Sequence, residues 1–131
     1  MGTPNPKRLF AGSGIGIAYT DPVRDLRPGV AFPANLTPDR RTGLGDWTDT
    51  QIAEAIKTGW HATGGTGLMV MPWRAYAQLS DSDTQALVTY LRSIPAVEHE
   101  VPARAAPDVN ARAPYVYFGV YRSGPAVEIR H

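Results

Sequence analysis

Asn35-Leu36-Thr37-Pro38-Asp39 opens the stretch that decides the fold expected for this chain, which continues through Gly43-Leu44-Gly45-Asp46-Trp47 and Met71-Pro72-Trp73 to a helical pattern ending at Pro95. Proline fixes its own backbone angle, and glycine tolerates tight turns that other residues avoid. The first two motifs therefore predict a series of turns that leads into a helix.

Two helices have clear start and stop signals. For the first, the capping box Thr48-x-x-Gln51 and the left-handed stop at Gly59 predict a helix over about residues 49–58. The second begins after Ser80 and cannot continue past Pro95. Its apolar face is expected to hold Leu87, Tyr90, Leu91 and Ile94. We expect a short helical turn at Trp73 to Gln78 between the two helices.

Length and composition limit the possible functions. With 131 residues, 43% of them hydrophobic and 19% charged, the chain suits one small globular domain. A net charge of +1 without any Lys/Arg block gives no basis for binding nucleic acid or an anionic membrane surface. No apolar run approaches the roughly 18 residues that a membrane-spanning helix needs. The absence of cysteine rules out disulfides and thiol catalysis within the sequence.

The chain contains no recognisable catalytic constellation. No His-Glu-x-x-His motif and no nucleophile elbow are present. The carboxylates Asp46, Asp49, Asp81 and Asp83 are explained by turns and helix starts, where negative charge stabilises the first turn. We therefore predict that the chain is not an enzyme.

The turn motifs and Met71-Pro72-Trp73 resemble the distal part of a class I cytochrome c domain, of the kind found in multi-haem cytochrome subunits of bacterial dehydrogenases. The resemblance covers about residues 7–102 and is best over 33–95. It implies a mainly α, degenerate cytochrome c-like domain at 1–102 with long loops and an extended C-terminal tail. Degenerate here means that the Cys-x-x-Cys-His motif, which attaches the haem in that family, is not in the sequence. The resemblance also implies a periplasmic location.

The same resemblance singles out two candidate cofactor ligands. Met71 occupies the position of the distal haem-iron ligand, a soft thioether that raises the reduction potential. If no haem is present, Met71 is expected to pack in the interior beside Leu68 and Trp73. His61 is the weaker candidate, as a substitute axial ligand, and its alternative is an ordinary surface histidine.

The tail at 103–131 differs in composition from the rest. Prolines, alanines and arginines form an extended linker, and the run from Tyr115 to Tyr121 has strand composition. That strand could cover the protein's own core or dock onto another subunit. Because alternation leaves apolar side chains on both of its faces, we predict a docking arm. Its contact residues are expected to be Tyr115, Tyr117, Phe118 and Tyr121.

Two functions remain open from the sequence. Because there are no cysteines, the first expectation is a haem-less accessory subunit without cofactor or metal, docked onto other protein subunits of a respiratory or photosynthetic electron-transfer complex. The alternative is an electron-transfer cytochrome c domain with Met71 as distal ligand, whose haem-attaching segment is supplied elsewhere.

Overall fold

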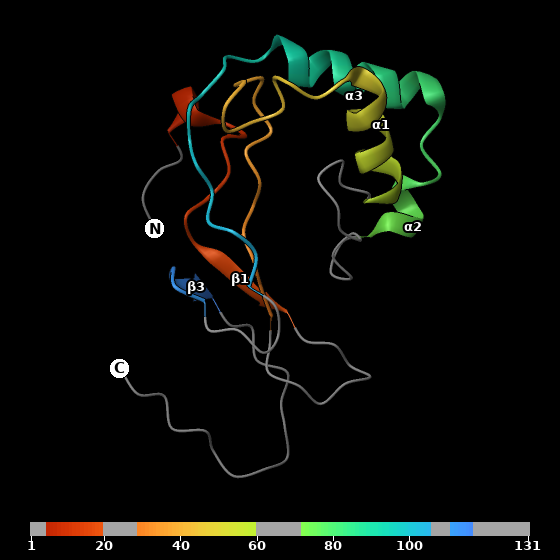
Figure 1. Ribbon diagram of the computed structural model, residues 1–131. Helices are drawn as coiled ribbons and strands as arrows, with labels where there is room; N and C mark the ends of the chain where they lie inside the picture. Colours follow the sequence, from red (N-terminus) through yellow and green to blue (C-terminus); the bar gives the residue numbers. More distant parts are fainter. Residues whose placement is uncertain (1–4, 20–28, 60–71, 106–110, 117–131) are drawn as a thin grey trace.

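The computed structural model describes residues 5–19, 29–59, 72–105 and 111–116. Three helices gather at one end, a small sheet lies at the other, and extended segments connect the two ends (Figure 1). In chain order the elements are the 3-10 helix η1 (Pro6–Arg8), β1 (Gly16–Tyr19), β2 (Gly29–Ala31), α1 (Asp49–Thr58), α2 (Trp73–Tyr76), α3 (Asp81–Ser93) and β3 (Tyr115–Val116).

The helix α1 begins and ends as its sequence predicts. The Thr48 hydroxyl accepts a hydrogen bond from the Gln51 backbone N–H at 3.1 Å, and the Gln51 side chain accepts from the Thr48 N–H at 2.9 Å. Gly59 ends the helix in the left-handed conformation, with φ 72°. These hydrogen bonds satisfy backbone N–H groups that have no partner within the helix.

The helices α2 and α3 also follow their signals. The Ser80 hydroxyl accepts from the Asp83 backbone N–H at 3.1 Å and caps α3. Helix α3 stops at Ser93, just before the proline at position 95. The predicted helical turn is α2, which starts at Trp73 directly after Pro72.

The buried residues of α3 lie beside its predicted apolar face. Thr84 and Val88 are buried, whereas Leu87 is 42% exposed and Tyr90 is 51% exposed. Helix α1 packs against α3, and Thr84 can be buried because its hydroxyl donates to the Ser80 carbonyl oxygen at 2.9 Å. The spacing that predicted an apolar face does not show by itself which stripe of the helix packs against its neighbour.

The sheet joins parts of the chain that are far apart in sequence. Its strand order is β2-β1-β3. Strand β1 pairs antiparallel with β2 and parallel with β3, where Gly16 lies opposite Tyr115. On the edge of β2 that faces away from β1, Val30 exchanges two backbone hydrogen bonds of 2.9 Å with Ala105. Two of the strands therefore lie before residue 33, while the cytochrome c-like fold class stays a prediction.

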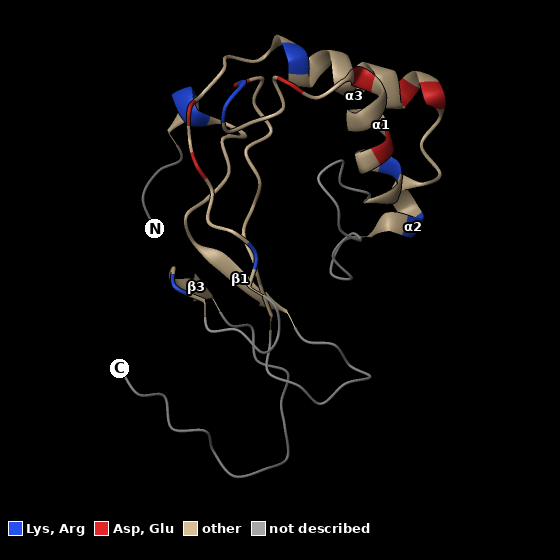
Figure 2. Ribbon diagram, viewed as in Figure 1, with Lys and Arg blue, Asp and Glu red and all other residues tan. Residues whose placement is uncertain are grey.

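The described residues bury few apolar side chains. The buried hydrophobic residues among them are Ala11, Val30, Ile52, Val88 and Ala105. The strands carry no charged residue, so the charges lie on the helices, the turns and the connecting segments (Figure 2). In the part of the molecule that the structure describes, several large hydrophobic side chains are exposed to solvent.

Candidate functional site

A polar cluster, made of Asn35, Thr37, Asp39 and Thr42, links the first turn motif to the segment that follows α3. The Asn35 amide donates to the Val97 carbonyl oxygen at 2.9 Å and to the Thr42 hydroxyl at 3.1 Å. Its carbonyl oxygen accepts from the Thr37 N–H at 3.0 Å and from the Thr37 hydroxyl at 2.8 Å. Asn35 is 4% exposed and Thr37 0%. Two polar side chains this deeply buried must satisfy each other and the backbone around them.

The cluster gives the first turn motif a long-range role in addition to its local turns. The Val97 N–H donates to the Thr37 hydroxyl at 3.1 Å, across 60 residues of chain. The His99 N–H donates to the Thr42 hydroxyl at 2.9 Å. Sequence reasoning missed these contacts because an Asn or Thr in a turn motif gives no sign of a distant partner.

Asp39 is held as a carboxylate by the same cluster. The Thr42 hydroxyl and the Thr42 backbone N–H each donate to Asp39 Oδ2 at 2.7 Å. These two hydrogen bonds, the side-chain one first, lower the pKa of Asp39 below its ordinary value, because they favour the charged form.

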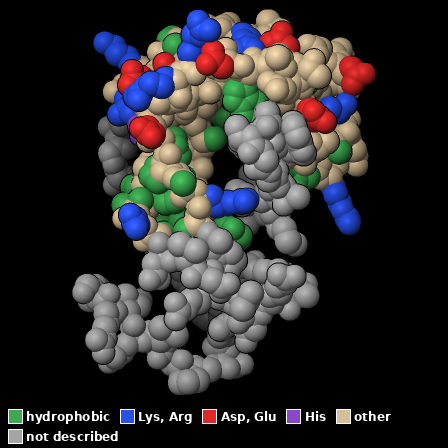
Figure 3. All heavy atoms as spheres, viewed as in Figure 1, with side chains coloured by type: hydrophobic (Ala, Val, Ile, Leu, Met, Phe, Trp, Pro, Cys, Tyr) green, Lys and Arg blue, Asp and Glu red, His purple; other side chains and the backbone are tan. Residues whose placement is uncertain are grey.

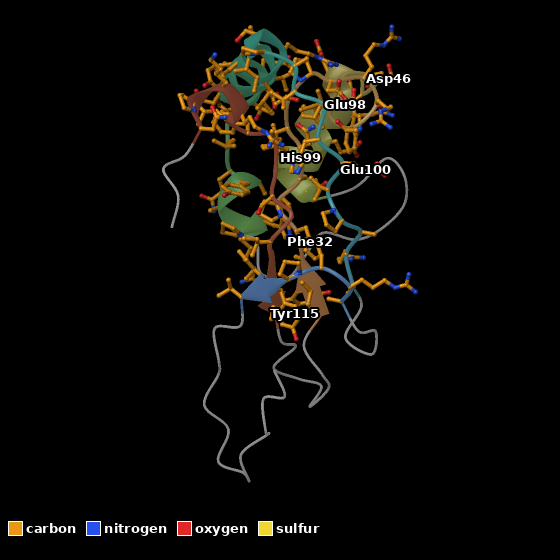
Figure 4. All side chains as sticks on the ribbon, turned by 90° about the vertical axis from the view of Figure 1, so that its left-hand side faces the viewer. Phe32, Asp46, Glu98, His99, Glu100 and Tyr115 are labelled. Carbon is orange, nitrogen blue, oxygen red and sulfur yellow. The ribbon has the colours of Figure 1, made fainter. Side chains whose placement is uncertain are left out.

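His99 connects the cluster to the N-terminal loop. Its Nδ1 lies 2.7 Å from the Ala11 carbonyl oxygen, and a carbonyl only accepts, so Nδ1 carries the proton and donates. Figure 4 shows His99 between Glu98 and Glu100 on the extended segment after α3. Nearby, the Leu36 N–H donates to the Phe10 carbonyl oxygen at 2.7 Å. The N-terminal loop, the first turn motif and the segment after α3 therefore form one hydrogen-bonded unit.

Arg92 joins the end of α3 to the start of α1. Its Nε donates to Asp49 Oδ1 at 3.0 Å, and Nη1 donates to the Leu44 carbonyl oxygen at 3.0 Å. Its Nη2 donates to the Trp47 carbonyl oxygen. A basic residue in the last turn of a helix was only a weak signal for this role, because such a residue usually interacts with the end of its own helix.

The glycines of the second turn motif are required by close backbone approach. A Cβ at Gly45 would lie 2.6 Å from the Pro38 carbonyl oxygen and 2.7 Å from backbone atoms of Arg40. A Cβ at Gly43 would collide with the Thr37 carbonyl oxygen. The predicted series of tight turns is confirmed.

An exposed apolar patch lies beside this unit. The Phe10 and Tyr90 rings meet edge to face, with centroids 6.0 Å apart. Leu87 lies one helical turn before Tyr90 on α3, so both share a face. Figure 3 shows hydrophobic side chains along the upper and left sides of a hollow below the helices, with most of the charged groups at the top of the molecule.

The structure describes one of the predicted site residues. Tyr115 lies in β3 with an exposed side chain. Met71, His61, Tyr117, Phe118 and Tyr121 fall outside the described residues. Within the described ranges, no group of three or more His, Cys, Asp or Glu side chains could hold a metal ion, and no helix is long and apolar enough to cross a bilayer.

Similarity to known proteins points to the cytochrome subunits of dehydrogenases. Over 81 residues, or 62% of the chain, the sequence is 35% identical to the gluconate 2-dehydrogenase cytochrome c subunit of Pantoea cypripedii. It is 26% identical over 86% of its length to the fructose dehydrogenase cytochrome subunit of Gluconobacter japonicus. It is 32% identical over 47% of its length to the cytochrome c subunit of the quinone-type alcohol dehydrogenase of Gluconobacter oxydans. No protein-family model matches the chain.

The chain spans only a small part of these relatives, 17%, 22% and 13% of their respective lengths. The similarity supports a cytochrome c-like relationship, and it agrees with the prediction that the chain is not itself an enzyme, since all three are named as cytochrome subunits. It overturns the prediction of no cofactor, because a cytochrome c subunit carries haem c. The missing cysteines were a misleading signal, since they concern only how the haem is attached.

Proposed function

We propose that these residues form the distal part of a haem c domain in an electron-transfer subunit of a dehydrogenase complex. The observation that carries the proposal is the similarity to cytochrome c subunits, together with the two turn motifs and Met71-Pro72-Trp73 in the sequence. The chain would then pass electrons between the complex and an acceptor.

The packing of the described residues fits a large apolar cofactor. Among the residues that the structure describes, five hydrophobic residues are buried and nine large hydrophobic residues are exposed. No buried side-chain polar atom among the described residues lacks a hydrogen-bond partner, so the interior offers no competing polar site. These exposed apolar side chains would suit packing against an apolar cofactor such as haem.

Met71 is the residue of this chain that would hold the haem iron. When bound, haem c supplies one-electron redox chemistry, and a thioether ligand favours the reduced iron. The chain would contribute the ligand, the rigid frame around it and exclusion of water. Because the 131 residues contain no cysteine, the thiols for covalent attachment would have to come from a segment outside this sequence.

The expected partners and location of the domain follow from the same proposal. The relatives are named as subunits of dehydrogenases, so the partners are expected to be other protein subunits of such a complex. Periplasmic exposure is expected for the same reason. Tyr115 and the residues after it remain the predicted contact to those subunits.

The experiment is spectroscopic and uses the native protein with its attached haem. Reduced pyridine complexes should give the spectrum of haem c. Met71→Leu should abolish the thioether-to-iron charge-transfer band of the oxidised protein and lower the reduction potential, because leucine cannot ligate iron. Met69→Leu is the matched control and should keep both properties. Absence of haem in the native protein, or an unchanged band in Met71→Leu, would reject the proposal.

A further inference from the structure

The strap, defined as residues 94–105, runs along the molecule from the end of α3 to the sheet (Figure 1). Its contacts with the first turn motif fall into two groups. At Val97 the backbone is bound by the side chains of Asn35 and Thr37, which carry no ionisable group. Both of these side chains are buried. This attachment should therefore not depend on pH.

The second attachment depends on the direction of one hydroxyl group. The Thr42 hydroxyl accepts from the His99 backbone N–H at 2.9 Å and from the Asn35 amide at 3.1 Å. A hydroxyl accepts two hydrogen bonds and donates one. Its single proton therefore points to Asp39 Oδ2, which lies 2.7 Å away. Asp39 thus sets the direction in which Thr42 offers its lone pairs to the strap.

The negative charge of Asp39 strengthens this arrangement. Its Oδ2 accepts from both the hydroxyl and the backbone N–H of Thr42, and hydrogen bonds to a carboxylate are roughly twice as strong as neutral ones. The pKa of Asp39 is lowered mainly by these two bonds and less by the backbone and charge of Arg41. Protonation of Asp39 weakens both bonds and lets the hydroxyl turn, so the His99 N–H loses a well-oriented acceptor.

Other charged and titratable groups near this point have weaker effects on that contact. Arg41 forms an ion pair with Glu98 of the strap, but the two side chains are 66% and 64% exposed, so solvent screens their attraction. The His99 ring donates from Nδ1 to the N-terminal loop, and Nδ1 keeps its proton when the ring becomes charged. This ring contact should therefore persist in acid.

We propose that Asp39 and Thr42 form an acid-sensitive latch, which releases residues 98 and 99 from the first turn motif while Val97 stays bound. The latch is closed while Asp39 is a carboxylate. Because the closed form binds a proton less readily than a free carboxyl does, the latch opens below the ordinary aspartate pKa of about 3.9. None of these contacts involves the candidate haem ligand, so the inference does not depend on the proposed function.

The test measures hydrogen exchange at the backbone amides of His99 and Val97 in the native protein, at about pH 6 and about pH 2.5. Protection factors are compared, because they remove the effect of pH on the exchange chemistry itself. Protection of His99 should fall about fivefold in acid, while that of Val97 should be unchanged. Equal losses at the two amides would show that the strap opens as a whole and would overturn the inference. This comparison needs no variant.

Three variants assign the effect to one carboxylate. Asp39→Asn should lower His99 protection already at about pH 6 and remove its further fall in acid. Asp46→Asn is the matched control, because Asp46 lies in the neighbouring turn motif but pairs with Arg40, and it should keep the fall. Glu98→Gln removes the exposed ion pair and should also keep most of the fall. If Asp39→Asn keeps the fall, or Glu98→Gln removes it, the latch is not at Asp39 and the inference is wrong.

Discussion

The Asn35 side-chain amide donates to the Val97 carbonyl oxygen at 2.9 Å, across 62 residues of sequence. This bond closes the loop that contains all three α-helices, since α1, α2 and α3 lie between the two residues. The turn motif and the segment after α3 thus form the base of the helical part of the domain.

Asn35→Asp should destabilise the protein by about 3 kcal/mol, because a carboxylate cannot donate to the carbonyl oxygens of Val97 and His99, and Val97 keeps only the Thr37 hydroxyl at 3.2 Å. The measurement is urea unfolding followed by circular dichroism. Asn5→Asp is the control: Asn5 accepts from the Lys7 N–H at an exposed helix start, and Asp accepts equally well. Equal midpoints for the two variants would contradict the role of the polar cluster.

Gly45→Ala should lower the free energy of unfolding by about 2 kcal/mol, because the added methyl group has to displace backbone atoms of Pro38 and Arg40. At Gly14 a Cβ would meet nothing within 4 Å. Gly14→Ala should therefore be neutral or slightly stabilising by roughly 0.5 kcal/mol. Thermal unfolding of both variants checks the pair, and a loss of stability in Gly14→Ala as large as in Gly45→Ala would show that the crowding around Gly45 is not the cause.

The free energy of unfolding should fall in acid, in part because Asp39 becomes protonated. Hydrogen bonds from Thr42 lower the pKa of the folded carboxyl, so the folded state binds a proton less readily than the unfolded state. The stabilisation is present above the unfolded pKa of about 3.9 and is lost as the pH falls through the lower folded value.

Asp39→Asn should therefore flatten the dependence of unfolding free energy on pH between about pH 5 and pH 2. Urea titrations at several pH values measure this slope. Asp83→Asn, which removes a carboxylate from the first turn of α3 without touching Thr42, serves as the control for lost charge. The assignment to Asp39 fails if the two variants flatten the curve to the same extent.

Truncation after Val116 should leave the domain folded, because it keeps the Val30–Ala105 bonds and β3. It should nevertheless weaken retention in the parent complex, since it removes the predicted contact residues Tyr117, Phe118 and Tyr121. Truncation after Pro102 also removes both sheet contacts and should cost stability as well. Co-purification and thermal unfolding separate the two effects. If the protein truncated after Val116 is fully retained in the complex, the tail is not a docking arm and instead packs within its own domain.

Much of the local structure follows from the sequence. The capping box at Thr48, the Ser80 cap, the stop at Gly59 and the glycines of the turns each act on backbone groups within a few residues. The candidate site was less accessible to such reasoning. The prediction of no cofactor is wrong because the absence of cysteines concerns only covalent attachment of a haem, and the roles of Met71 and His61 stay predictions.

The positions of the helices and turns could therefore be predicted from short stretches of sequence, because a cap or a tight turn needs only neighbours in the chain. Long-range packing was needed to bring Asn35 to Val97, to pair β1 with β3, and to bury Thr84 and Val88 of α3 beside its predicted apolar face. These choices depend on which surfaces compete for burial once distant segments meet. A hydrogen-bonding side chain or an apolar stripe has the same local sequence whichever partner it finds.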